Sequence, residues 1–137
     1  MGAGDDIYLG NPLLKKANVQ FDFTKDQIKE YIKCKKDPVY FTRNYVKIVS
    51  LDEGLVPFNM WDFQEELIKK FHNNRFNIAK LPRQTGKSTT VVSYLLHYIL
   101  FNDNVNIGIL ANKASTARDL LARLAIAYEN LPKWIQQ

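Results

Sequence analysis

The chain has 137 residues, of which 46% are hydrophobic and 24% are charged, and its formal net charge is +5. This composition is ordinary for one globular domain, and the positive charge favours an anionic partner such as a nucleotide or nucleic acid. The single cysteine, Cys34, excludes an internal disulfide and a cysteine-based metal cluster. No signal peptide is visible, and the most apolar run is much shorter than the roughly 20 residues of a membrane span. The sequence therefore predicts neither secretion nor a membrane location.

The N-terminal part of the sequence predicts an arm followed by a helix. Residues 1–23 mix Gly, Asp, Asn and Pro without periodicity, which is typical of a loosely ordered arm. Thr24 is suited to cap a helix whose apolar residues recur at helical spacing until Asp37-Pro38 stops the pattern. Residues 39–51 are β-branched and aromatic, and they admit either a strand or a second helix.

The next segments alternate between helix and strand. Residues 61–71 place their apolar side chains on one helical face and predict a helix that ends near the HNNR stretch. Residues 76–81 predict a short buried strand, and residues 87–101 a helix with a broad apolar face. Residues 105–111 are apolar at nearly every position, as expected of a strand covered on both faces.

A last helix completes the pattern. Either Asn112 or Ser115 is suited to cap this helix, and Pro132 stops it. Because strand, helix, strand and helix follow one another, the sequence predicts an α/β fold with a parallel sheet.

The stretch KLPRQTGKSTT, residues 80–90, lies between the first predicted strand and its helix and matches a phosphate-binding loop. In such a loop Gly86 permits close approach of the backbone, Lys87 reaches the β- and γ-phosphates, and the hydroxyl of Ser88 ligates Mg²⁺. Leu81 stands where the usual pattern begins with glycine. A first turn that needs no positive φ would allow this leucine to anchor the strand end in the core.

Arg83 and Gln64 each admit two interpretations. Arg83, inside the loop, either stabilises charge at the γ-phosphate as an arginine finger in cis or is a solvated side chain at the loop tip. Gln64 either pairs with the N6 and N7 edge of adenine, with Trp61 or Phe63 stacked on the ring, or is an exposed helix glutamine beside two core aromatics.

Five segments of the chain together resemble the large terminase subunit of tailed bacteriophages, particularly its myovirus-type branch: YLGNPLLKK, KDPVYFTRNYVKIVSLDEGLVPF, DFQEELI, RFNIAKLPRQTGKSTTVV and GILANKASTA. The loop is the most specific of them, since terminases commonly have Arg-Gln before x-Gly-Lys-[Ser/Thr] and lack the leading glycine. The resemblance implies a P-loop NTPase fold of the ASCE, RecA-like type. On this basis we expect an N-terminal arm (1–23), a mostly helical segment with the adenine-reading motif (24–75) and the first half of the ATPase core with an incomplete parallel sheet (76–137).

The resemblance also implies site residues and partners. Arg83 and Lys87 would be catalytic, Ser88 would bind Mg²⁺, and ATP would contact Gln64, Arg83, Gln84, Thr85, Gly86, Lys87, Ser88 and Thr89. The family packs double-stranded DNA into the prohead by hydrolysing ATP, and it cuts the DNA. The expected partners are therefore double-stranded DNA, the portal protein, the small terminase subunit and further copies in a homo-oligomeric ring. The expected location is the cytoplasm of an infected bacterium, at the portal vertex of the prohead.

The sequence departs from the family in one respect, because it lacks several of the family's later motifs. A terminase has a later strand ending in Asp-Glu, a coupling motif and an RNase H-like nuclease, and none of these occurs in the 137 residues. We therefore expect an N-terminal part of a longer protein that binds nucleotide without efficient turnover. Lys113 and Arg118 either contact a DNA backbone or are ordinary surface charges. A superfamily 2 helicase or DNA translocase and a non-catalytic nucleotide-binding or scaffold module are the alternative functions.

Overall fold

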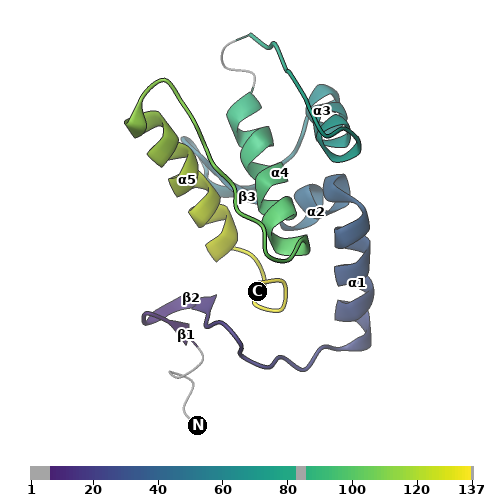
Figure 1. Ribbon diagram of the computed structural model, residues 1–137. Coiled ribbons are helices and arrows are strands. Elements are labelled where there is room, and N and C mark those ends of the chain that lie inside the picture. The colour runs from purple at the N-terminus through teal and green to yellow at the C-terminus, as the bar shows by residue number, and fades with distance from the viewer. Residues whose placement is uncertain (1–6, 83–85, 137) are drawn as a thin grey trace.

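The computed structural model describes residues 7–82 and 86–136. These residues form a mixed α/β structure in which helices predominate and the strands make two separate antiparallel pairs (Figure 1). The elements in chain order are β1 (Ile7–Tyr8), β2 (Asn11–Lys15), α1 (Lys25–Lys36), α2 (Pro38–Tyr45), β3 (Lys47–Ser50), β4 (Gly54–Pro57), α3 (Asp62–Asn73), α4 (Lys87–Phe101) and α5 (Ala114–Glu129).

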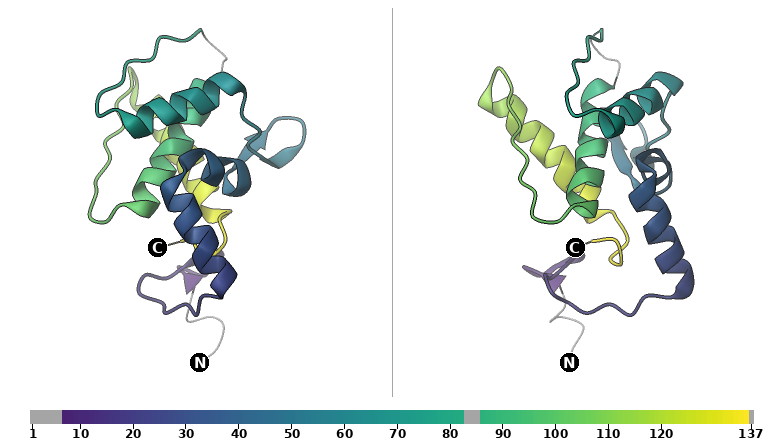
Figure 2. Two further views of the ribbon diagram at one scale, coloured as in Figure 1. Left: turned by 90° about the vertical axis from the view of Figure 1, so that its right-hand side faces the viewer. Right: turned by 45° about the vertical axis from the view of Figure 1, so that its right-hand side comes forward.

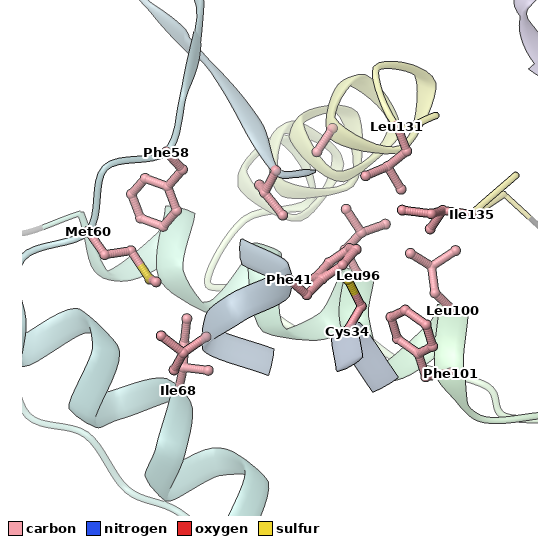
Figure 3. Close-up of a cluster of buried hydrophobic side chains, with 13 residues drawn as sticks. Cys34, Phe41, Phe58, Met60, Ile68, Leu96, Leu100, Phe101, Leu131 and Ile135 are labelled. Atoms are coloured by element: carbon pink, nitrogen blue, oxygen red, sulfur yellow. The ribbon is translucent and has the colours of Figure 1, made fainter. Parts of the chain in front are cut away.

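Helix α4 is the centre of the core and packs against α2, α3 and α5 (Figure 1). Its bounds are those that the sequence predicts, and its mean hydropathy is the highest among the described helices. Leu96 and Leu100 are fully buried against Phe41 of α2 and Ile135 near the C-terminus (Figure 3). The apolar face is narrower than predicted, because Val91 of this helix is 41% exposed.

Two caps decide how α1 and α2 begin and end. Thr24 and Gln27 form a reciprocal capping box, with the Gln27 backbone N–H donating to Thr24 Oγ1 at 3.2 Å and the Thr24 N–H donating to Gln27 Oε1 at 3.0 Å. The predicted cap at Thr24 is therefore confirmed. Asp37 ends α1 as predicted, and its Oδ1 also accepts from the Val39 N–H at 3.0 Å. Asp37 thus begins α2, with Pro38 in the first turn where its missing N–H costs no bond.

The ambiguous stretch 39–51 contains both of the structures that its sequence admits. Its first part belongs to α2, and its second part forms β3, which pairs antiparallel with β4. The hairpin turn at 51–53 leads into Gly54, whose φ of 74° favours glycine. Figure 2 shows this hairpin projecting from the helical body.

The N-terminal arm contains a hairpin that the sequence analysis does not predict. Strands β1 and β2 pair antiparallel around a turn at Leu9 and Gly10, both of which have positive φ. Gln136, which is 1% exposed, holds β2 against the C-terminal segment. Its Oε1 accepts from the Lys15 N–H at 3.0 Å, and its Nε2 donates to the Leu13 carbonyl at 2.9 Å. The predicted loosely ordered arm therefore contains a hairpin at residues 7–15, which is held to the rest of the chain by partners more than 100 residues away in the sequence.

The predicted parallel sheet is absent from the described residues. Residues 77–82 and 105–111 run extended beside α4, but among the described residues neither segment pairs with a strand. Residues 105–111 are not covered on both faces, since Leu110 is 98% exposed while Ile107 and Ile109 are half-buried. Ile78 in the first segment is likewise fully exposed. In the first segment the side chains of residues 77–80 are exposed, and among the described residues neither segment has the neighbouring strand that a sheet requires.

Two further predictions concern helix ends and membrane segments. Helix α5 begins after Lys113 without a side-chain cap, so the prediction of Asn112 or Ser115 as the cap was wrong. Helix α3 ends at Asn73, as the HNNR stretch predicts. Within the described ranges, every helix is too short or too polar to cross a membrane.

Candidate functional site

Gly86 forms the junction between the predicted phosphate loop and α4. It is the N-cap of the helix, with φ 70° and ψ 20°, a left-handed conformation that glycine adopts without steric cost. Its carbonyl accepts from the Thr90 N–H at 3.0 Å and from Thr90 Oγ1 at 2.9 Å. Thr90 is itself fully buried, so these two bonds fix the helix start from the core side.

The first turn of α4 presents the groups that a phosphate requires. Thr90 is the first residue of α4 whose N–H donates to a carbonyl at this helix start. The N–H groups of Lys87, Ser88 and Thr89 come before it and therefore have no carbonyl partner within the helix. The helix dipole adds partial positive charge at the same end. The Lys87 side chain is exposed, and those of Ser88 and Thr89 are half-buried. A backbone start of this kind, followed by a lysine, is suited to bind an anion.

Gln64 lies where α3 meets the start of α4. It is 4% exposed, and its Oε1 accepts from the Trp61 N–H at 2.9 Å at the beginning of α3. A Cβ added to Gly86 would lie 2.5 Å from Gln64 Nε2, so the amide occupies the space that a side chain at Gly86 would need. Of the two interpretations, that of an exposed helix glutamine is therefore wrong, because the side chain is buried against the glycine, and the adenine-reading role stays a prediction.

The two aromatic residues beside Gln64 differ in exposure. Trp61 is 62% exposed and is not a core residue, whereas Phe63 is half-buried. Their ring centroids lie 5.7 Å apart. Of the two, Trp61 offers the more open ring face for stacking.

An apolar cavity of about 250 Å³ lies beside the start of α4, and Lys87 and Ser88 form part of its wall. Apolar side chains from α3, α4, α5 and both extended segments make up the remainder, among them Leu81, Leu67, Val92, Ile109 and Leu120. Leu81 is half-buried here, and its φ is not positive. Both observations support the interpretation that leucine replaces the usual first glycine because the strand end needs an apolar anchor and no left-handed turn.

The remaining candidate residues form two groups. Arg83, Gln84 and Thr85 lie outside the described residues, so their predicted roles stay predictions. Lys113 and Arg118 are exposed at the start of α5. Across residues 7–82 and 86–136, no group of three or more His, Cys, Asp or Glu side chains is placed to hold a metal ion. Ser88 is the metal ligand that the sequence predicts, and its hydroxyl supplies the oxygen that Mg²⁺ prefers.

The structure contains an ion pair next to Gln64 that the sequence does not predict. Glu65, the residue after Gln64, pairs with Arg43 and so joins α3 to α2. These residues are 22 positions apart and belong to different helices, so no local pattern signals the contact. The pair fixes the same end of α3 that carries Gln64.

No protein-family model matches the chain.

Proposed function

We propose that the chain binds ATP with Mg²⁺ at the start of α4, as part of a P-loop NTPase fold. The observation that carries this proposal is the left-handed Gly86 followed directly by Lys87 and Ser88 at a helix start. The N–H groups of the first turn, which have no carbonyl partner within the helix, would meet the phosphate oxygens, and the exposed Lys87 ammonium would neutralise their charge. Bound Mg²⁺ would bridge the phosphates and take one ligand from the Ser88 hydroxyl.

We further propose that the chain is the nucleotide-binding part of a DNA-packaging terminase large subunit. Two features support this choice within P-loop proteins: the Arg-Gln pair before the loop glycine and Gln64 beside that glycine. The extended segments 77–82 and 105–111 would then be sheet strands of the ATPase core. On this proposal the whole protein couples ATP hydrolysis to the movement of double-stranded DNA through a portal, in the cytoplasm of an infected bacterium, as one copy in a ring.

Calorimetric titration with ATP and Mg²⁺ tests the phosphate site. We expect Lys87→Ala to weaken ATP binding at least tenfold, because a charge-assisted contact to phosphate contributes roughly 1.5–3 kcal/mol. Lys133→Ala is the matched control, since Lys133 is also exposed but lies near the C-terminus. Equal affinities for ATP in the wild type and in Lys87→Ala would contradict the proposal.

A further inference from the structure

We infer that the ion pair between Arg43 and Glu65 positions the start of α3 for contact with the nucleotide base. This role rests on the proposed nucleotide binding at α4 and concerns what holds the base-facing residues beside that site. Trp61, Phe63 and Gln64, the candidates for contact with the base, all lie at the start of α3. Arg43 belongs to α2 and would act on the base only through Glu65, as a positioning residue.

The first turn of α3 links Glu65 to two of these candidates by hydrogen bonds. The N-cap residue is Trp61, whose side chain does not cap the helix. The Gln64 side chain accepts from the Trp61 N–H at 2.9 Å. The backbone N–H groups of Gln64 and Glu65 both donate to the Trp61 carbonyl, at 3.0 and 3.2 Å. An interaction that holds Glu65 therefore also holds Trp61 and Gln64.

Apolar contacts hold α3 in the core. Met60, just before the helix, and Ile68 within it are buried, and Figure 3 shows them with Phe58 at one side of the core cluster. Hydrophobic burial is not directional, so these contacts define the rotation of a helix about its axis less well than a hydrogen-bonded contact does. The ion pair adds a directed contact between α2 and α3 at the end of α3 that carries Trp61.

Arg43 and Glu65 are favourably placed for this contact. Both Nε and Nη2 of Arg43 contact Glu65 Oε1. The Glu65 side chain is 20% exposed, whereas the side chains of the Lys70–Glu66 pair in the same helix are 63% and 67% exposed. Solvent therefore screens the Arg43–Glu65 pair less. Arg43 also lies in the last turn of α2 and Glu65 in the first turn of α3, where each charge is favoured by its own helix dipole.

A positioning role predicts a loss of affinity that depends on the base. If the pair orients the start of α3, breaking it weakens binding of ATP by a larger factor than binding of inorganic triphosphate, which has no base. If the pair only stabilises the fold, both ligands lose affinity by the same factor or neither loses any.

Calorimetric titrations with ATP and with inorganic triphosphate, each with Mg²⁺, compare Arg43→Gln, Glu65→Gln and the double variant with the wild type. We expect each single variant to lose about threefold to fivefold in affinity for ATP, the upper part of what an ion pair near the surface contributes, and clearly less for triphosphate. The double variant should lose no more than either single variant, because the two residues act as one pair.

The chain contains a matched control for Glu65. Glu66 is the next residue of α3 and pairs with Lys70 of the same helix at an exposed position. Glu66→Gln should bind both ligands as the wild type does. Arg43→Glu combined with Glu65→Arg restores the pair with its charges reversed and should recover most of the lost ATP affinity. This reversed pair keeps the test open if a single variant fails to fold.

Four results would overturn the inference. Equal losses for ATP and triphosphate would make the pair a structural contact only. Unchanged ATP affinity in both single variants would show that the pair has no role in binding. Losses that add in the double variant would show that Arg43 and Glu65 act separately. A wild-type protein that binds neither ligand would remove the proposed function as well, whereas the first three results leave phosphate binding at α4 in place.

Discussion

Buried polar side chains of this chain either fix the start of a helix or join two helices. Among the described residues, every buried side-chain nitrogen and oxygen has a hydrogen-bond partner. Thr90 bonds Gly86 at the start of α4, and His97 further along the helix lies 2.8 Å through Nε2 from the Cys34 carbonyl. Gln64 belongs to the same group. Because an unpaired buried polar group costs about 1–3 kcal/mol, His97 ties α4 to the end of α1, while Thr90 and Gln64 fix the starts of their own helices.

His97 makes the stability of the fold depend on pH. Burial lowers its pKa to about 4 from an ordinary 6.5, and nearby His72 adds to the effect. Above pH 6.5 the ring is neutral in both the folded and unfolded states. Between pH 6.5 and 4 the unfolded state takes up a proton that the folded state excludes, so stability falls by up to ~3 kcal/mol. Urea unfolding at pH 7 and at pH 4.5 measures this loss.

The control separates His97 from other titrating groups. In His97→Gln, stability should fall less between the two pH values than in the wild type, because the proton uptake is gone. In His72→Gln the fall should lie between those of the wild type and His97→Gln, because removing His72 takes away only a smaller contribution to the lowered pKa of His97. An equal fall in His97→Gln and in the wild type would contradict this account.

Residue type was enough to predict some of these positions and not others. Thr24 and Gly86 were identified from the sequence because a helix cap and a tight turn are set by neighbouring residues. The burial of Gln64 was not, since it depends on the packing of α3 against the start of α4. The exposure of Trp61 was missed for the same reason: an aromatic residue predicts burial only on average.

Elements that satisfy their own hydrogen bonds were the ones that the sequence predicts well. The bounds of α4 and the end of α1 follow from apolar spacing and from the Asp37-Pro38 pair, which are local signals. The segments 76–81 and 105–111 were predicted as buried strands, but the structure assigns no strand to either, and Ile78 and Leu110 are exposed. A strand also needs a partner, however, and periodicity carries no information about pairing. The predicted parallel sheet therefore stays part of the proposed fold.

At the scale of the whole molecule, hydrogen bonds join the N-terminal hairpin to the C-terminal segment. Gln136 bonds the backbone of β2, and its Nε2 also lies within hydrogen-bond distance of the Leu131 carbonyl at 3.2 Å and the Tyr128 carbonyl at 3.3 Å. Asn11 of the hairpin donates to Glu129 at the end of α5. Figure 1 shows β2 and the C-terminal segment side by side. No local pattern predicts these contacts, which span 118 residues or more between the hairpin and the C-terminal region.

We expect Gln136→Leu to release the hairpin from the body of the protein. Leucine has a similar size but bonds neither the Lys15 N–H nor the Leu13 carbonyl, so roughly 2–3 kcal/mol of stability should be lost. Hydrogen exchange at residues 11–15 measures the release, and Gln20→Leu, at an exposed position, is the control. Unchanged exchange at the hairpin in Gln136→Leu would show that other contacts hold it.

The central claim is that the first turn of α4 binds the triphosphate of a nucleotide. Nuclear magnetic resonance of the ¹⁵N-labelled chain during titration with ATP and Mg²⁺ tests it most directly. Backbone N–H groups that gain a phosphate partner change their chemical environment more than groups elsewhere. We predict that the largest shifts occur at Lys87, Ser88 and Thr89. Amide signals that stay in place at these three residues while ATP is in excess would contradict the claim.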